Sequence, residues 1–277
     1  MSLTIESTVQ LNNGTPMPLF GLGVFRIPAG RITKSSVLEA IRLGYRHIDT
    51  AESYGNEASV GEEIRESGVS RSEIFVTTKL TGGNQGFDSC TRAFNESLLR
   101  LGLDYVDLYL IHWPVKDLRL ESWRAMEKLL IGGKVKAIGV SNFMVHHIEE
   151  LLNHTDVVPA VNQIELHPYN FMYRKNLVDL CQAHGIQIEA YAPLTRRKKL
   201  RHRNLRKVAA KYGKTPAQIL IRWALEHQFV VIPKSAKPAR IQENADVFDF
   251  AISADDMDFL DSFNRNLIVC WDPTNAP

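Results

Sequence analysis

The sequence predicts an α/β fold of the (β/α)8 TIM barrel type. Short runs rich in Val, Ile and Leu recur along the chain, and stretches with apolar residues at helical spacing lie between them. Strands that alternate with helices are typical of parallel βαβ units. Eight such units fit a length of 277 residues, whereas a doubly wound sheet usually has fewer strands or a second domain. Because no linker or break in composition divides the chain, we expect one barrel domain over residues 1–277.

The first predicted element is a β-hairpin near the N-terminus. Residues 8–11 and 17–19 flank Asn13 and Gly14. An Asn-Gly pair between two such segments is a strong signal for a tight hairpin turn. Because the hairpin precedes the first repeating unit, we expect it to plug the barrel.

The apolar runs themselves are the predicted barrel strands, seven of them clear and the eighth weaker. They comprise residues 45–49, 74–79, 106–112, 137–141, 160–166, 186–191, 229–234 and, as the weaker run, 246–250. Residues 89–101 and 120–130 are examples of the amphipathic stretches between them, which are predicted to be helices. Little of the chain remains after the last unit, so we expect a short C-terminal tail.

The composition is that of an ordinary globular protein. Hydrophobic residues make up 44% of the chain and charged residues 23%, which argues against disorder and fibrous sequence. No apolar stretch approaches the ~20 residues of a membrane helix, and the N-terminus lacks the pattern of a secretory signal. We therefore expect a cytoplasmic protein without a membrane partner. Three widely spaced cysteines, Cys90, Cys181 and Cys270, argue against a disulfide framework.

The net charge of +2 conceals one basic run. Six of the 33 Lys and Arg residues lie within residues 196–203 (RRKKLRHR), and removing these six leaves 27 basic residues against 31 acidic ones, a net charge of −4. One short cluster without interleaved aromatic residues gives little support for nucleic-acid binding. We expect no nucleic-acid partner.

The sequence contains neither a complete Rossmann fingerprint nor a metal motif. Residues 21–26 (GLGVFR) lack the third glycine and precede a helix-poor segment, so a nucleotide would have to be held in another way. The histidines show no HxH or HExxH spacing, and the adjacent His146 and His147 point to different helix faces. We therefore expect no metal site.

Polar residues close several of the predicted strands. In a barrel, catalytic groups project from the C-terminal ends of different strands, and Asp49, Lys79 and His112 end the first three runs, with Tyr54 just after the first. Taken singly, Asp49 could be a helix cap, Lys79 a solvated strand end and His112 a hydrogen-bonded core histidine. Together, an Asp, a Lys and a His at one face of three successive strands, beside a tyrosine, predict a charge-coupled acid site.

Such a group suits proton donation to a carbonyl oxygen. Tyrosine has a reference pKa of about 10, and a neighbouring ammonium lowers it. We therefore expect Lys79 to lower the pKa of Tyr54 while Asp49 holds and orients the lysine. His112 would donate a hydrogen bond that fixes the carbonyl.

Several segments resemble the signature segments of the aldo-keto reductases, in that family's order and spacing. They are residues 44–51 (GYRHIDTA) followed by Tyr54, 111–114 (IHWP), 139–142 (GVSN), 162–165 (NQIE) and 232–235 (IPKS). The resemblance runs from about Val9 to Phe263. Residues 21–25 and 246–250 are most similar to the small microbial branch that includes the 2,5-diketo-gluconate reductases. The resemblance implies an NADPH-dependent oxidoreductase that reduces aldehydes or ketones to alcohols.

The resemblance also implies roles for individual residues. It makes Asp49, Tyr54, Lys79 and His112 a catalytic tetrad with Tyr54 as the general acid. The positions that match NADP-binding ones are Ser141, Asn142 and Gln163 for the nicotinamide carboxamide, Tyr191 for stacking on the nicotinamide ring, Pro193 and Leu194 in the loop that follows, Lys234, Ser235 and Arg240 for the 2′-phosphate, and Glu243 and Asn244 for the adenine side. A lysine and an arginine that converge on a dianion favour NADPH over NADH. The alternative for Arg240 and Glu243 is a surface pair on one helix.

For the substrate pocket, the resemblance implies Phe25, Tyr54, His112 and Trp113, with Trp271 as a further contributor. The chain stops at Pro277 and lacks the long C-terminal loop of larger members. We therefore expect an open pocket for small carbonyls such as methylglyoxal or keto-sugars, in a monomeric protein. The alternative is an NADPH-binding regulatory subunit with little turnover.

One loop departs from the family pattern. Residues 192–195 are APLT where the family usually has Ser-Pro-Leu-Gly, and the basic run follows directly. In the family this loop lies against the cofactor pyrophosphate. Arg196, Arg197 and Lys198 are therefore candidates for phosphate contacts, and the alternative is a solvated basic loop.

Overall fold

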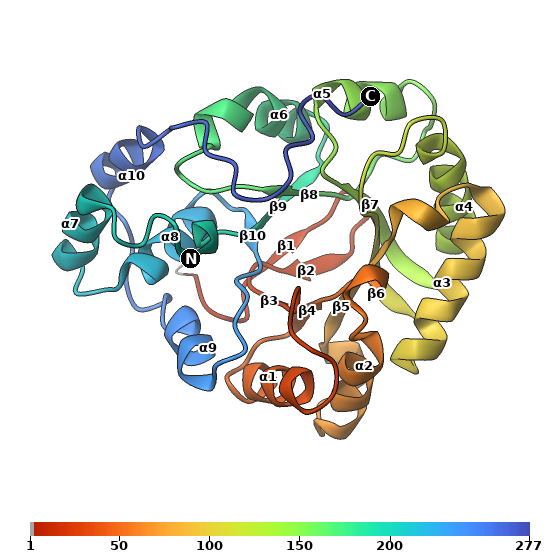
Figure 1. Cartoon of the computed structure of the whole chain (residues 1–277), viewed down its shortest axis with the longest axis horizontal. Coiled ribbons are helices and arrows are strands. Elements are labelled where there is room, and N and C mark those ends of the chain that lie inside the picture. The colour runs from red at the N-terminus through yellow and green to blue at the C-terminus, as the bar shows by residue number, and fades with distance from the viewer. Residues whose placement is uncertain (1–2) are drawn as a thin grey trace.

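Eight parallel strands form the central sheet of the protein in this computed structural model, which describes residues 3–277. In spatial order they are β3 (Leu22–Gly23), β4 (His47–Asp49), β5 (Phe75–Leu80), β6 (Val106–Ile111), β7 (Val135–Ser141), β8 (Val161–Glu165), β9 (Gln187–Tyr191) and β10 (Val230–Val231). The two ends of this order meet, because Phe20 forms a parallel bridge to Val231 and the Gly21 N–H donates to the Val231 carbonyl at 3.0 Å. The sheet is therefore closed into the predicted barrel (Figure 1).

Seven of the predicted strands overlap observed ones, but the weaker eighth, residues 246–250, is wrong. This segment leaves the end of α9 (Pro238–Ala245) and packs on α8 (Pro216–Glu226), where Arg222 donates to the Val247 carbonyl at 3.0 Å. The eighth strand is instead β3, which is only two residues long. Glycines allow it to enter the barrel wall, because a Cβ at Gly21 would lie 2.6 Å from Nδ1 of His47.

The predicted N-terminal hairpin is present. Strands β1 (Thr8–Gln10) and β2 (Pro16–Pro18) pair antiparallel around Gly14, whose φ of 83° favours glycine. The turn is fixed to the barrel by Asn13, which donates to the Lys136 carbonyl at 2.8 Å, beside the start of β7. Met17 is fully buried. The hairpin therefore closes the end of the barrel at which the strands begin, and it lies behind the strands in Figure 1.

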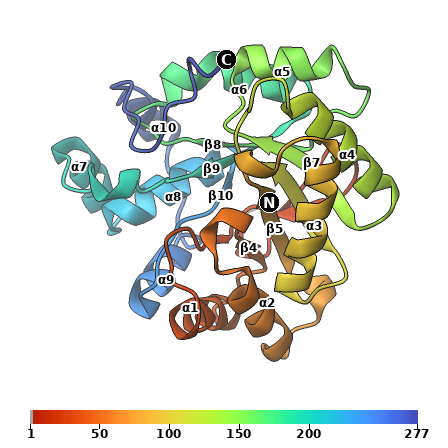
Figure 2. The same ribbon diagram turned by 45° about the vertical axis from the view of Figure 1, so that its right-hand side comes forward.

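Helices surround the barrel on all sides (Figure 2). They are α1 (Arg31–Arg42), α2 (Glu57–Glu66), α3 (Phe87–Leu101), α4 (Arg119–Ile131), α5 (Val145–Leu152), α6 (Phe171–Ala183), α7 (Arg203–Lys211), α8, α9 and α10 (Ala254–Asp261). The predicted helical stretches 89–101 and 120–130 lie within α3 and α4. Within residues 3–277, no helix has the length and apolar character needed to cross a membrane.

The C-terminal tail runs back over the ends of the strands and is tied down along its length. The N–H groups of Arg265 and Leu267 donate to the Tyr169 carbonyl at 2.8 and 3.2 Å. Further along, Arg174 forms an ion pair with Asp272 at 2.7 Å. In Figure 1 the tail crosses in front of β8 and β9, on the face opposite the hairpin. The short tail thus covers the end of the barrel where catalytic groups of this fold gather.

The close contact between α2 and α3 gives a prediction for stability. A Cβ at Gly61 would lie 1.7 Å from the carbonyl oxygen of Leu101, so Gly61→Ala must push the two helices apart. We expect the free energy of unfolding in urea to fall by roughly 2–4 kcal/mol, as for other overpacked sites. Gly83→Ala is the matched control, because no atom lies within 4 Å of the added Cβ. An equal effect of the two substitutions would contradict the packing argument.

Candidate active site

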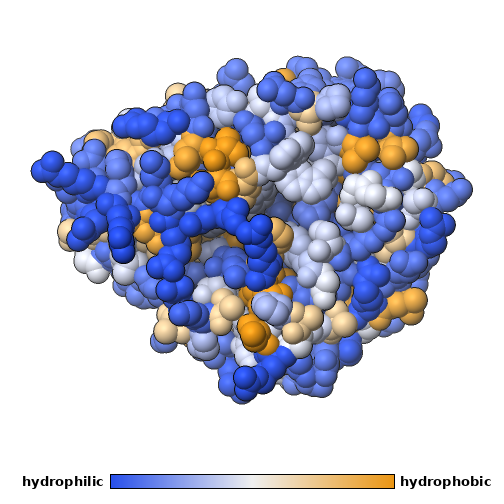
Figure 3. Space-filling view, viewed as in Figure 1, coloured by the Kyte–Doolittle hydropathy of each residue, from blue (hydrophilic) through white to orange (hydrophobic). Residues whose placement is uncertain are grey.

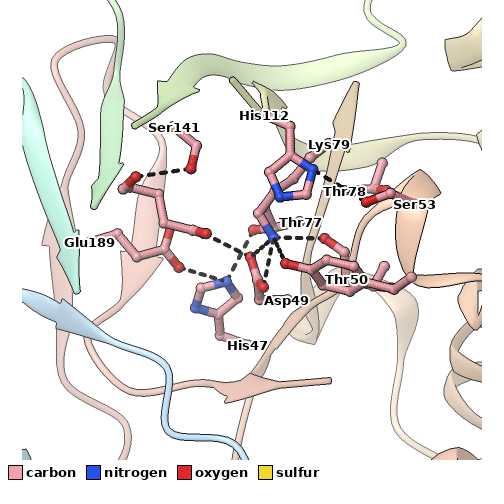
Figure 4. Close-up of polar contacts among 12 residues, drawn as sticks. His47, Asp49, Thr50, Ser53, Thr77, Thr78, Lys79, His112, Ser141 and Glu189 are labelled. Carbon is pink, nitrogen blue, oxygen red and sulfur yellow. Dashed lines mark hydrogen bonds and ion pairs between the residues drawn. The ribbon is translucent and has the colours of Figure 1, made fainter. Parts of the chain in front are cut away.

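A buried lysine stands at the centre of the candidate site (Figure 4). Lys79, on β5, is fully buried, and its Nζ donates to both carboxylate oxygens of Asp49, on β4, at 2.7 Å. It also donates to the Thr50 carbonyl at 2.8 Å and lies 3.4 Å from the hydroxyl oxygen of Tyr54. A buried ammonium is costly unless it is paired and hydrogen-bonded. This set of acceptors provides both conditions and fixes the position of Nζ.

Tyr54 is aimed at Nζ by a short turn after β4. It ends the 3-10 helix η1 (Glu52–Tyr54), and Gly55 follows with a φ of 66°. The Tyr54 ring packs on Phe25, with 4.9 Å between ring centroids, and on His112 at 5.7 Å. Since Lys79 donates to the phenol oxygen, the proton of Tyr54 is free to point toward a substrate.

The net shift of the pKa of Tyr54 is upward in this structure, contrary to the prediction. Burial, together with the negative charges of Asp49 and Glu189, raises the pKa of the Tyr54 hydroxyl well above its ordinary value. Burial is the largest of these causes, and Asp49, 2.7 Å from Nζ, offsets the charge of Lys79. Tyr54 is therefore held as a neutral phenol, which is the form that donates a proton.

His112 follows the end of β6 and is also neutral. Burial and the nearby positive charge of Lys79 lower the pKa of His112 to about 3. Its Nδ1 lies 3.4 Å from the hydroxyl oxygen of Ser53, which can donate to it. That arrangement leaves the proton on Nε2, where it can donate to a carbonyl oxygen held near Tyr54.

Below these four residues lies a second buried polar group, of which the sequence indicated Gln163 but not Glu189 or His47. Gln163 donates from Nε2 to Asp49 at 2.8 Å and to Glu189, on β9, at 2.9 Å. His47 donates to or accepts from the Thr77 hydroxyl at 3.0 Å and lies 3.7 Å from Glu189. Burial and the negative charge of Asp49 raise the pKa of Glu189 to about 8. The one signal in the sequence is a glutamate between two apolar residues, Ile188 and Ala190, within the strand.

The predicted nicotinamide-binding residues form a connected chain at the ends of the next strands. Ser141 donates from its hydroxyl to the main-chain carbonyl of Gln163 at 2.9 Å, and the Asn142 side-chain amide donates to the Ser141 hydroxyl at 2.9 Å. The Tyr191 hydroxyl donates to the Asn142 side-chain oxygen at 2.7 Å. Asn142 has a φ of 64°, a conformation that asparagine tolerates better than most residues. The hydrogen bond to Asn142 fixes the position of the Tyr191 hydroxyl at the end of β9.

The residues predicted to bind the 2′-phosphate lie together at the start of α9. Lys234 and Ser235 precede this helix, Arg240 lies within it, and Glu243 and the buried Asn244 are on its last turn. Partial burial and the nearby charge of Arg26 lower the pKa of Lys234. A phosphate would relieve this repulsion, and a helix N-terminus adds further attraction for an anion. These residues fit the phosphate of NADP.

The surface pair considered for Arg240 and Glu243 is not among the ion pairs formed within residues 3–277. Arg240 is half-buried on α9. Its guanidinium therefore remains available for an anion.

The loop after β9 has an unusual backbone. Ala192, Thr195, Arg196 and Arg197 all have φ between 46° and 68°, where glycine is favoured. Thr195 occupies the position of the family's glycine, and its side chain is buried, accepting the Lys199 N–H at 3.1 Å. Pro193 and Leu194 lie within this loop. Such strain persists only where surrounding contacts hold it, and it is common at functional sites.

Aromatic rings border the mouth of the site. Trp113 stacks on His112 at 5.3 Å between ring centroids, and Trp271 meets Trp113 edge-on at 4.8 Å. Phe25 is 46% exposed and Trp271 51% exposed, so both rings are available to a ligand. Figure 3 shows a hollow near the middle of this face, with hydrophilic side chains along part of its border. The four predicted substrate residues thus form one continuous series of ring contacts, from Phe25 through Tyr54 and His112 to Trp113.

Metal ligands are not gathered at this site or elsewhere in the described part of the chain. Residues 3–277 contain no group of three or more His, Cys, Asp or Glu side chains that could hold a metal ion. His146 and His147 lie on α5, and each contacts the Ala276 carbonyl at about 3 Å. They hold the end of the tail, far along the chain from the tetrad.

Comparison with known proteins identifies the family. The Aldo/keto reductase family model matches residues 19–265. The chain belongs to the aldo/keto reductase family. It is 50% identical over 266 residues to the glyoxal reductase of Bacillus subtilis, covering 96% of each chain.

Solved structures agree with this assignment. An aldo-keto reductase from a deep-sea metagenome library superposes with a TM-score of 0.93 at 47% identity, covering 97% of this chain and 99% of that one. A variant of Gox0644 solved in complex with NADPH has a TM-score of 0.92 at 41% identity, covering 98% and 99%. The predicted family and barrel fold are therefore confirmed.

The buried carboxyl group of Glu189 predicts a pH-dependent stability. A carboxyl whose pKa is raised to about 8 in the folded state stabilises the fold below its unfolded pKa and loses this contribution as the pH rises through 8. Glu189→Gln removes the ionisable carboxyl group, so the variant does not lose stability in this way as the pH rises. In urea unfolding, we expect the variant to gain stability relative to the natural protein between pH 5 and pH 8.5. A difference that does not change with pH would show that Glu189 is ionised in the folded protein.

Proposed function

We propose that this aldo/keto reductase reduces aldehydes and ketones to alcohols with NADPH, and that Tyr54 is the general acid. The observation that supports this most directly is the contact of the Tyr54 hydroxyl with Lys79, which is itself held by Asp49. The protein is an NADP-dependent oxidoreductase by its family. A relative of 41% identity has been solved in complex with NADPH, and the residues around Tyr191 and α9 are suited to the same cofactor.

The cofactor-binding residues divide into two groups. Ser141, Asn142 and Gln163 would hold the nicotinamide carboxamide beside the Tyr191 ring, while Lys234 and Arg240 would bind the 2′-phosphate. Pro193 and Leu194 would line the path between them, and Ser235, Glu243 and Asn244 would complete the adenosine end. When bound, NADPH supplies the hydride for the carbonyl carbon. The protein contributes the position of both reactants and the proton.

Proton delivery follows from the tetrad. The neutral His112 would hold the carbonyl oxygen with its Nε2 proton, close to the Tyr54 hydroxyl. As negative charge develops on that oxygen, Tyr54 donates its proton, and Lys79 stabilises the phenolate that forms because it already donates to the same oxygen. Asp49 keeps Nζ in place throughout. No residue has to move for the transfer.

The substrate class follows from the rings around the opening. Phe25, Tyr54 and Trp113 form an apolar wall beside the polar pair that would bind a carbonyl oxygen. We propose small aldehydes and ketones, including methylglyoxal and keto-sugars, as substrates. The glyoxal reductase of Bacillus subtilis, 50% identical, supports this class.

Tyr54→Phe tests the general acid. Without the phenol proton, we expect kcat to fall by about 100-fold or more, while the dissociation constant of NADPH stays within about twofold because the nicotinamide-binding residues are unchanged. Turnover is followed by NADPH absorbance with methylglyoxal, nitrobenzaldehyde and a keto-sugar, and binding by fluorescence titration. Near-normal turnover of the variant would refute Tyr54 as the acid. NADPH binding by the natural protein without consumption of any substrate would favour the regulatory alternative.

Arg240→Ala tests cofactor preference. Loss of a charged partner for the 2′-phosphate should raise the dissociation constant of NADPH by about 10- to 100-fold and leave that of NADH within about twofold. The matched control is Arg206→Ala, which removes an exposed arginine from α7. If both cofactors weakened equally, Arg240 would not be a phosphate ligand.

A further inference from the structure

The middle of the C-terminal tail is held by a buried carboxylate. Glu165, at the end of β8, is 4% exposed. One of its oxygens accepts the Val269 N–H at 2.7 Å, and the other accepts the Cys270 N–H at 2.8 Å. The His167 ring lies 3.1 Å from the same carboxylate. Hydrogen bonds to a charged acceptor are among the stronger ones in proteins, so Glu165 fixes two successive residues of the tail.

An arginine of the basic run contacts the same segment. Arg196 donates from Nη1 to the Val269 carbonyl at 3.3 Å. Arg196 therefore contacts the protein itself. The two roles considered from the sequence were a phosphate contact and a solvated basic loop. Its φ of 46° belongs to the strained loop after β9. This contact gives the strained backbone a partner that keeps it in place.

The held segment leads directly to the wall of the site. Trp271 follows Cys270 and meets Trp113 edge-on at 4.8 Å, and Trp113 stacks on His112. On either side the tail has independent attachments, at Tyr169 before this segment and at Arg174 after it. Loss of the contacts to Glu165 and Arg196 would therefore free residues 268–271 without releasing the whole tail.

We propose that Glu165 and Arg196 act as a two-sided clamp on Val269 and Cys270 and are positioning residues for substrate binding. The clamp holds Trp271 against Trp113, so that it sets the width of the opening for the carbonyl substrate. This role rests on the proposed reductase function. It predicts an effect on substrate affinity and little effect on NADPH affinity.

The labelling rate of the Cys270 thiol measures whether the clamp is intact, and this measurement does not depend on catalysis. It is the partly exposed one of the three cysteines, whereas Cys90 and Cys181 are buried. Its thiol can therefore be labelled in the folded protein with a disulfide reagent such as DTNB, and Cys270→Ser confirms the site of labelling. Burial and the charge of Glu165 raise the pKa of the Cys270 thiol to about 11, and Arg196 opposes this rise.

The two explanations of Arg196 then predict opposite results. If Arg196 acted only through its charge, Arg196→Ala would raise the thiol pKa further and slow labelling. If it clamps the tail, Arg196→Ala exposes Cys270, and we expect labelling to become about tenfold faster, with partial rescue in Arg196→Lys. Arg201→Ala is the control, because it removes an exposed charge from the same basic run. Labelling of Arg196→Ala at or below the natural rate would overturn the proposal.

Kinetics test the consequence for substrates. For nitrobenzaldehyde, we expect Arg196→Ala and Glu165→Gln each to raise KM by about tenfold with kcat within about twofold, and the double variant to add little because both act through one segment. The dissociation constant of NADPH should stay within about twofold. A large loss of NADPH affinity with unchanged labelling would make Arg196 a phosphate ligand and overturn the clamp.

Two controls keep the outcomes distinct. Thermal unfolding of Glu165→Gln checks that the variant is folded before its KM is compared. If the natural protein reduced no carbonyl, the proposed function would fail, whereas the labelling rates and the NADPH titration would still decide whether the clamp exists.

Discussion

The ion pair between Lys79 and Asp49 is the interaction on which the rest of the site depends. An ammonium with no exposed surface is tolerated in the barrel only because Asp49, Thr50 and Tyr54 surround it with acceptors. Asp49 is in turn held by Gln163, which also donates to the carboxyl group of Glu189. Because the pKa of Glu189 is raised to about 8, the carboxylate that pairs with Lys79 in this group is that of Asp49. Burial is the main reason that Tyr54 and His112 are neutral in this environment.

Barrel closure brings this pair and the ligand-binding residues to the same end of the molecule. Asp49, Lys79 and His112 come from three neighbouring strands, and the residues of the nicotinamide group come from the next three. The hairpin closes the opposite end, so the strand ends with the polar residues are the ones open to ligands. The tail crosses that end of the barrel, where Glu165 accepts from Val269 and Trp271 contacts Trp113.

Much of this arrangement was predictable because polar residues follow apolar runs at regular intervals. Asp49, Lys79 and His112 could be recognised in that way, and the barrel follows from the alternation of strands and helices. The short strand β3 escaped prediction because glycine-rich segments lack the apolar run of a strand. Residues 246–250 imitate a strand because Val247, Phe248 and Phe250 are apolar, but they contact Arg222 and Phe20 instead of joining the sheet. Glu189 and His47 also escaped, because a single polar residue inside a strand does not identify its partner.

The sequence by itself determined the fold class and the family, and it indicated Asp49, Tyr54, Lys79 and His112 as candidate site residues, because these depend on residue types and spacings that occur along the chain. The tertiary structure decided the properties that depend on contacts between distant segments. Tyr54 is buried beside the carboxylate of Asp49, so its pKa is raised and not lowered as the neighbouring ammonium suggested. The contact made by the basic run likewise depends on the tertiary structure, because Arg196 donates to Val269, more than 70 residues further along the chain. Burial and through-space charge have no counterpart in residue order, and they set the chemistry of the site.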